Sequence, residues 1–233
     1  MNLWIGTSGF QYPEWKGSFY PEKMPASGML PFYAAQFPTT EVNYSFRRIP
    51  SATTIAKWHA ATPERFKFSF KAPQKVTHFA KLRDTGETIR FFHSVITAMD
   101  AKLGAVLFQL PPTLKKDVAL LSAFLADLPS ELEAAFEFRH ASWMDEEVFD
   151  ALRHGNAAVC IADSEDLTTP PVATASFGYL RLRREDYASD DLARWGAFVK
   201  AQTHWRDAYV YFKHEAAGVG PKFARTFQQL TNA

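Results

Sequence analysis

Polar and ionisable side chains follow most of the short apolar runs in this sequence. Glu41 and Asn43 stand two residues apart in one run, as do Glu137 and Arg139 in another. Because side chains two residues apart in a strand point to the same side, each pair should share a face. Carboxylates can transfer protons, and guanidinium groups beside them can bind anions. Similar groups end other runs, at Thr7, Ser8, Lys71, Gln109, Asp163, Arg181, Arg183 and Lys213.

The charged members of this set favour a hydrolase-like enzyme, a hydrolase or lyase, that acts on an anionic substrate. Lys71, Arg139 and Arg181 would bind a phosphate or carboxylate group of a small ligand. Glu41 or Glu137 would act as the general base, with a pKa set by burial and by the nearby cations. We therefore expect the two glutamates to be catalytic residues.

Other side chains of the same segments complete the expected site. His78 follows the Lys71 run and could donate a proton to the leaving group as a third catalytic residue. Tyr12 and Trp15 would pack in the core or a lid and, where exposed, stack on a ring. Gln109 would orient a neighbour rather than react. The predicted substrate-binding residues are Ser8, Tyr12, Trp15, Asn43, Lys71, Gln109, Arg139 and Arg181.

A binding module without turnover, for nucleic acid or a phosphorylated ligand, is the first alternative. Tyr or Trp rings would stack on bases beside a basic surface. The net charge of +1 gives no support to tight nonspecific binding of nucleic acid. The basic surface would be formed by Arg47, Arg48, Arg181, Arg183, Arg184 and Lys213.

A metal-dependent barrel hydrolase or isomerase is the second alternative. Its ligands would be Glu41, Glu137 and Asp163, with His78 or His214. No HxH or HExxH spacing is present and the adjacent cations would repel a metal, so no metal is expected. A glycosidase would need two glutamates about 5–10 Å apart on either side of a sugar.

Eight runs rich in β-branched and aromatic residues must position these side chains. They begin near residues 3, 39, 66, 104, 133, 157, 177 and 208. Continuous apolar runs are typical of parallel strands buried on both faces, and each gap can hold a crossover. The pattern predicts a single TIM-type (β/α)8 barrel domain over residues 1–233. Thr168-Thr169-Pro170-Pro171 predicts a short or missing sixth helix.

Apolar residues at helical spacing mark the crossovers between these runs. Ile89, Phe92 and Ile96 lie on one such stripe, and Asp84 with Glu87 resembles a capping box in front of it.

The active sites of such barrels lie at the C-terminal ends of the strands. Almost every run delivers a polar group to that rim, so we favour a functional site. The same charges can also form a buried salt-bridge network with a structural role only.

Composition limits the remaining possibilities. Forty-seven per cent of the residues are apolar, which is enough for a large core. Cys160 is the single cysteine, so no intrachain disulfide can form, and its apolar run indicates a core position. The sequence shows no signal peptide and no long apolar stretch, which predicts a cytoplasmic location and no membrane partner. It has no P-loop or dinucleotide fingerprint, and no cofactor is expected.

Several motifs together resemble the YecE-like family, domain of unknown function number 72. The resemblance runs from the first predicted strand to the last predicted helix. It implies a TIM barrel, and it implies no established activity and no known protein partner. The motifs are Gly6-Thr7-Ser8-Gly9-Phe10, Glu41-Val42-Asn43, Phe68-Ser69-Phe70-Lys71-Ala72-Pro73, Gln109-Leu110-Pro111-Pro112, Glu137-Phe138-Arg139, Tyr179-Leu180-Arg181 and Tyr209-Val210-Tyr211-Phe212.

Overall fold

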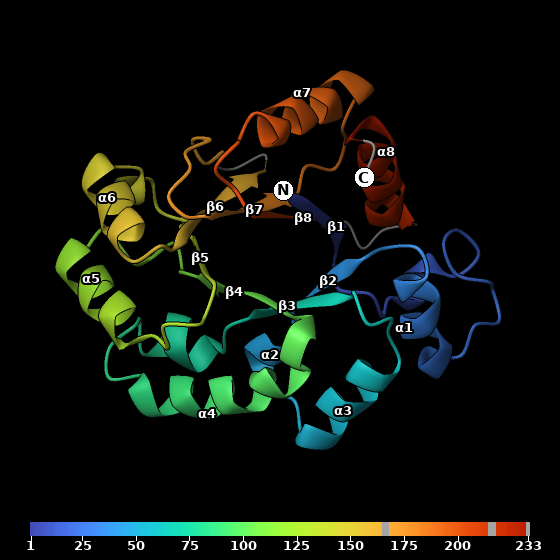
Figure 1. Cartoon of the computed structure of the whole chain (residues 1–233), viewed down its shortest axis with the longest axis horizontal. Coiled ribbons are helices and arrows are strands. Elements are labelled where there is room, and N and C mark those ends of the chain that lie inside the picture. Colours follow the sequence, from blue (N-terminus) through green and yellow to red (C-terminus); the bar gives the residue numbers. More distant parts are fainter. Residues whose placement is uncertain (165–167, 214–217, 232–233) are drawn as a thin grey trace.

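Eight parallel strands form the centre of the molecule, as the apolar runs predict (Figure 1). The computed structural model describes residues 1–164, 168–213 and 218–231. The strands follow one another around a closed barrel, and β8 pairs with β1 to complete it. They are β1 (Asn2–Ser8), β2 (Thr39–Val42), β3 (Lys67–Lys71), β4 (Leu103–Gln109), β5 (Ala134–Glu137), β6 (Ala158–Asp163), β7 (Phe177–Leu182) and β8 (Asp207–Phe212).

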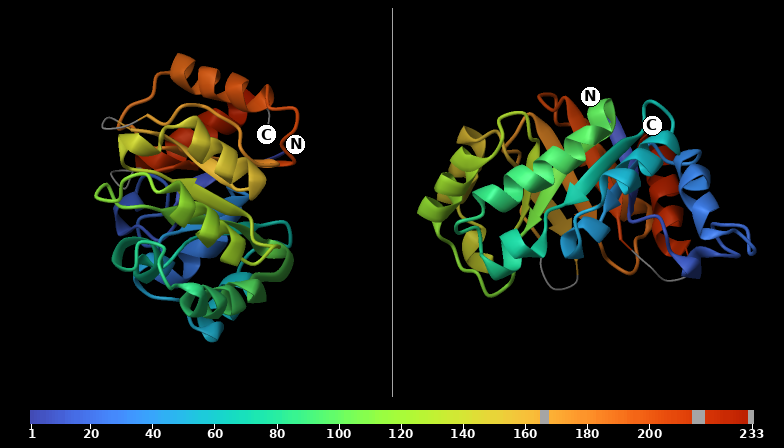
Figure 2. Two further views of the ribbon diagram at one scale, coloured as in Figure 1. Left: turned by 90° about the vertical axis from the view of Figure 1, so that its left-hand side faces the viewer. Right: turned by 90° about the horizontal axis from the view of Figure 1, so that it is seen from below.

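Helices surround the strands on the outside (Figure 2), so the TIM-type (β/α)8 barrel prediction is confirmed. Ser164 and residues 168–176, the described part of the β6–β7 connection, contain no helix. No described helix is long and apolar enough to cross a membrane. The helices are α1 (Ala26–Ala34), α2 (Tyr44–Arg47), α3 (Ala52–Ala60), α4 (Gly86–Ile96), α5 (Val118–Asp127), α6 (Glu146–His154), α7 (Ser189–Lys200) and α8 (Val219–Thr231).

The residues in front of α5 and α4 show where side chains cap the helices. At the start of α5, the side chain of Asp117 accepts a hydrogen bond from the backbone N–H of Leu120 at 2.9 Å. The predicted capping box before α4 is wrong. Thr85 is the N-cap residue and makes no side-chain cap, while Asp84 has a φ of 52° in the left-handed region. The turn in front of α4 therefore places the Asp84 carboxylate outside the capping position.

Two cores hold the barrel together. The larger lies between the strands and the helices, and it contains most of the phenylalanines. The smaller fills the inside of the barrel and includes Cys160, Tyr179 and Tyr211. Cys160 is fully buried, which raises the pKa of its thiol and confirms the predicted core position. The Tyr211 hydroxyl lies 2.8 Å from the hydroxyl oxygens of both Ser69 and Thr39, so these three hydroxyls inside the barrel are hydrogen bonded.

Candidate functional site

One buried arginine joins two buried carboxylates where β2, β5 and β7 end. Arg181 Nη2 lies 2.8 Å from Glu41 Oε1, and Arg181 Nη1 lies 2.5 Å from Glu137 Oε2. All three side chains are at most 2% exposed. Strand alternation points these positions into the barrel, and parallel pairing brings them to one end. The sequence therefore predicts correctly that the three charges share one rim, and the structure places Arg181 between the two glutamates.

Glu41 has two further hydrogen-bond donors. The Tyr179 hydroxyl donates to Oε2 at 2.7 Å, and Asn43 Nδ2 donates to Oε1 at 3.3 Å. Ser8, the residue opposite Glu41 in the β1–β2 register, is buried beside it. Burial alone would raise the pKa of Glu41, but the Arg181 guanidinium and the Tyr179 hydroxyl outweigh it and leave the pKa lowered. Glu41 is thus held as a carboxylate.

Glu137 is contacted by four side chains. Besides Arg181, its Oε1 accepts from Gln109 Nε2 at 2.9 Å, and lies 3.3 Å from Arg139 Nε and 3.5 Å from Arg183 Nη1. Burial opposes ionisation here too, but the three guanidinium groups lower the pKa of Glu137 well below its usual range. Glu137 is therefore ionised near pH 7 and has no proton to donate at that pH.

Lys71 lies at the end of β3 beside this cluster. Its Nζ donates to Gln109 Oε1 at 2.8 Å and lies 4.0 Å from the centre of the Phe46 ring. Burial lowers the pKa of Lys71 to about 7, with help from Arg181 and Arg139 and against the attraction of the two glutamates. Gln109 therefore connects Lys71 to Glu137, which agrees with its predicted orienting role.

His78 lies in a single turn of π-helix, Lys75–Phe79, which follows β3. Such turns occur often at functional sites. The His78 ring packs edge-on against Phe46 with 4.9 Å between ring centres, and its Nδ1 lies 2.9 Å from the Thr77 hydroxyl. Burial and the charges of Lys71 and Arg139 lower the pKa of His78. His78 and Lys71 thus contact the same phenylalanine, although no spacing rule in the sequence predicts the π turn.

An aromatic cavity of about 470 Å³ adjoins the charged cluster. Asn43 belongs to both, because it lines the cavity and donates to Glu41. Tyr12 also lines it, and its hydroxyl donates to the Ser8 carbonyl at 2.7 Å. Tyr44, which is 52% exposed, and Trp58 also line the cavity, and Trp58 was not predicted from the sequence.

Trp15 does not line this cavity, so its predicted packing in the core is confirmed and its predicted binding role gains no support. It is 1% exposed and packs among Tyr12, Phe19 and Tyr20 in the core. Its motif therefore serves to support the loop after β1, and Trp15 is not part of the candidate binding surface.

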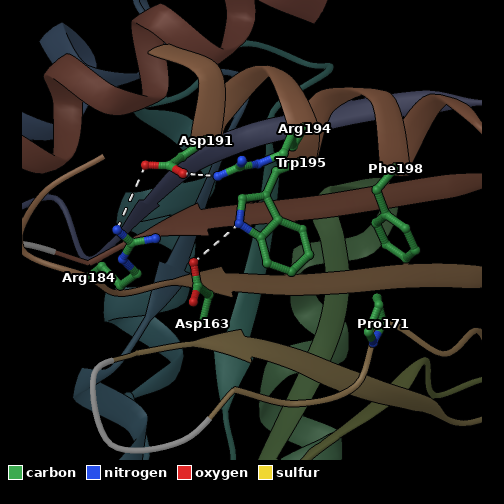
Figure 3. A pocket seen from close by; sticks show the side chains of 7 residues that line it. All are labelled: Asp163, Pro171, Arg184, Asp191, Arg194, Trp195 and Phe198. Carbon is green, nitrogen blue, oxygen red and sulfur yellow. Dashed lines mark hydrogen bonds and ion pairs between the residues drawn. The ribbon is translucent and has the colours of Figure 1, made fainter. Parts of the chain in front are cut away.

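Asp163 points towards Trp195 of α7 (Figure 3). Its Oδ2 accepts hydrogen bonds from Trp195 Nε1 at 3.2 Å and from the Tyr187 hydroxyl at 3.0 Å. There it lines a cavity of about 310 Å³, together with residues that include Pro171 and Arg184. Alternation explains this, because Cys160 faces the interior of the barrel and Asp163 stands three positions further along β6, on the opposite face.

The structure gives the metal-dependent alternative no ligand set. Within residues 1–164, 168–213 and 218–231, no group of three His, Cys, Asp or Glu side chains could hold a metal ion. Glu41 and Glu137 are paired with Arg181, and Asp163 is elsewhere. His214, the remaining ligand candidate, lies outside the described residues. A glycosidase arrangement is also unsupported, because a guanidinium lies between the two glutamates where a sugar would have to fit.

The chain matches one family model along nearly its whole length and curated relatives over part of it. Residues 4–233 match the family described as a protein of unknown function, DUF72. The UPF0759 protein YecE of Escherichia coli K12 is 27% identical over 139 residues, covering 59% of this chain and 48% of YecE. The UPF0759 protein YunF of Bacillus subtilis 168 is 32% identical over 150 residues, covering 60% and 52%. The chain thus spans about half the length of the curated relatives it matches.

Solved structures agree with this assignment. A DUF72 family protein from Thermotoga maritima has a TM-score of 0.87 and 26% identity, and the match covers 100% of both chains. A glycoside hydrolase family 5 enzyme from Prevotella bryantii has a TM-score of 0.55 and 10% identity over 99% of this chain and 96% of its own, which reflects the fold alone. Taken with the strand-end motifs that the barrel brings together, the match over residues 4–233 shows that this chain belongs to the DUF72 family.

Proposed function

We propose that this protein is a hydrolase-like enzyme that binds a phosphate- or carboxylate-bearing substrate at the C-terminal mouth of the barrel. One observation carries the proposal. Two carboxylates are surrounded by four cationic side chains, those of Lys71, Arg139, Arg181 and Arg183. An excess of positive charge in a partly desolvated mouth favours an anion.

The contacts divide the roles among these residues. Arg181 is fully buried and both of its terminal nitrogens are paired, so it positions the two carboxylates. Arg139, whose side chain is 35% exposed, and Arg183, which is 21% exposed, can reach an anion from the mouth. Lys71 adds a third positive charge when it is protonated. The anion would therefore bind above the Arg181 pairs.

Glu41 and His78 would transfer the protons of the reaction. Glu41 is ionised and can accept a proton from a nucleophilic water, although its lowered pKa makes it a weak base. His78 lies beside Phe46 at the edge of the cluster and would carry a proton to the leaving group. The cavity lined by Tyr12, Asn43 and Tyr44 would hold the remainder of the substrate.

A thermal-shift screen tests the anion site. Inorganic phosphate, sugar phosphates, nucleotides and short single-stranded DNA would be added to the wild type and to Arg139→Gln. A ligand at 100 times its Kd stabilises the native state by about 2.7 kcal/mol, which raises Tm by several degrees. We expect phosphorylated ligands to raise Tm in the wild type and to lose that effect in Arg139→Gln.

The matched control is Arg90→Gln, which removes an exposed arginine of α4 and should keep the shift. An equal shift in Arg139→Gln, or no shift with any anion, would contradict the proposal. Glu41→Gln separates an enzyme from a binding module, because a binding module keeps its affinity in this variant and an enzyme loses turnover.

A further inference from the structure

The amine of Lys71 has surroundings unlike those of a surface lysine. Both carboxylates of the cluster are paired with Arg181 rather than with Lys71. The Lys71 amine instead contacts a neutral amide, Gln109, and the face of an aromatic ring, Phe46. These neighbours stabilise an ammonium ion less than a carboxylate does.

Burial is the largest influence that favours loss of the Lys71 proton, because it removes water from the ammonium. Arg181 and Arg139 repel the ammonium, whereas Glu137 and Glu41 attract it. The balance gives a pKa of about 7. About half of the molecules would therefore hold a neutral amine at neutral pH, and a desolvated lysine next to other cations is a known form of activated nucleophile. His78 is the further titratable group beside it.

We propose that Lys71 is a nucleophilic residue that forms an imine with a small carbonyl compound bearing a carboxylate or phosphate. The placement of that compound rests on the proposed anion site. Gln109 links Lys71 to the same Glu137 oxygen that Arg139 and Arg183 approach, so an anion held by these arginines would lie beside the amine.

The proposed step needs no further reactant. The neutral amine nitrogen attacks the carbonyl carbon, and a C–N bond forms as the C=O double bond becomes a hydroxyl-bearing single bond. The two protons of the amine leave with the carbonyl oxygen as one water molecule, and a C=N double bond remains between the compound and Lys71. Formation of this imine would activate the neighbouring carbon for bond cleavage or proton loss, which is lyase chemistry.

Reductive trapping tests the inference on the full chain. The protein would be incubated with glyoxylate and sodium cyanoborohydride, which reduces an imine to a stable amine, and labelled lysines would be mapped by mass spectrometry. We expect Lys71 to be labelled at least about ten times faster than the exposed Lys75 at pH 7, because a large share of the Lys71 amine is neutral at that pH. The rate at Lys71 should level off above pH 7.

A second probe separates this inference from the anion site. Glycolaldehyde is an aldehyde of similar size without a carboxylate. A larger ratio of Lys71 to Lys75 labelling with glyoxylate than with glycolaldehyde supports both proposals. Equal ratios with the two probes, both well above one, support the imine and contradict the anion site. Labelling of Lys71 no faster than of Lys75 with either probe overturns the inference.

Discussion

Replacing Arg181 with methionine should destabilise the protein by about 3–5 kcal/mol, because it leaves two buried carboxylates without their shared cation. Glu137 keeps Arg139 and Arg183, whereas Glu41 keeps the neutral donors Tyr179 and Asn43 and the weaker attraction of Lys71. The loss is a large part of the 5–15 kcal/mol that stabilises a typical domain. Urea unfolding followed by tryptophan fluorescence at pH 7 would measure it.

The pH dependence of the folding stability should change as well. In the wild type the pKa values of Glu41 and Glu137 are lowered, so their stabilisation is full above the unfolded-state value of about 4.3 and is lost as pH falls below it. Without Arg181, burial dominates and raises the pKa of Glu41 above its unfolded value. The variant should then become more stable as pH falls from 7 towards about 4.5.

A triple variant provides the control. Arg181→Met combined with Glu41→Gln and Glu137→Gln removes all three charges and keeps their shapes, so it should recover at least half of the lost stability. A loss below about 1 kcal/mol in Arg181→Met, or stability of that variant that does not rise on acidification from pH 7 to about 4.5, would refute the assignment of Arg181 as the centre of the cluster.

Three further changes test other parts of the structure. Arg139→Gln should raise the pKa of Lys71 above about 7 by removing a repulsive charge, and the pH profile of lysine labelling would show it; a downward shift would contradict the cluster's geometry. Gly178→Ala should destabilise the protein by about 1–3 kcal/mol in urea, because its Cβ would overlap the Trp205 ring. Asp117→Ala should cost about 1 kcal/mol by removing the cap of α5, and an unchanged unfolding midpoint would exclude that role.

The strands and the rim could be predicted because parallel strands buried on both faces are continuous apolar runs. Strand alternation then places Glu41, Glu137 and Arg181 inside the barrel. Applied within β6, the same rule also explains why Asp163 faces α7, since Cys160 faces inward.

Other parts of the site depend on contacts that the sequence does not display. The burial of Arg181 between two carboxylates follows from the closure of the barrel across β2, β5 and β7. The cavity side formed by Tyr44 and Trp58 requires α2 and α3 to pack beside the loop after β1. The π turn that carries His78 precedes left-handed residues, Lys81 and Leu82, whose types give no signal for that conformation.

The described β6–β7 connection without a helix has a consequence for local motion. In the other units a crossover helix follows its strand, but the outer end of β6 is covered by Trp195, which belongs to the next helix, α7. Loosening of α7 would therefore uncover the end of β6 while the rest of the barrel stays closed. Amide hydrogen exchange near Asp163 should then follow the opening of α7, so these two segments would form one cooperative unit.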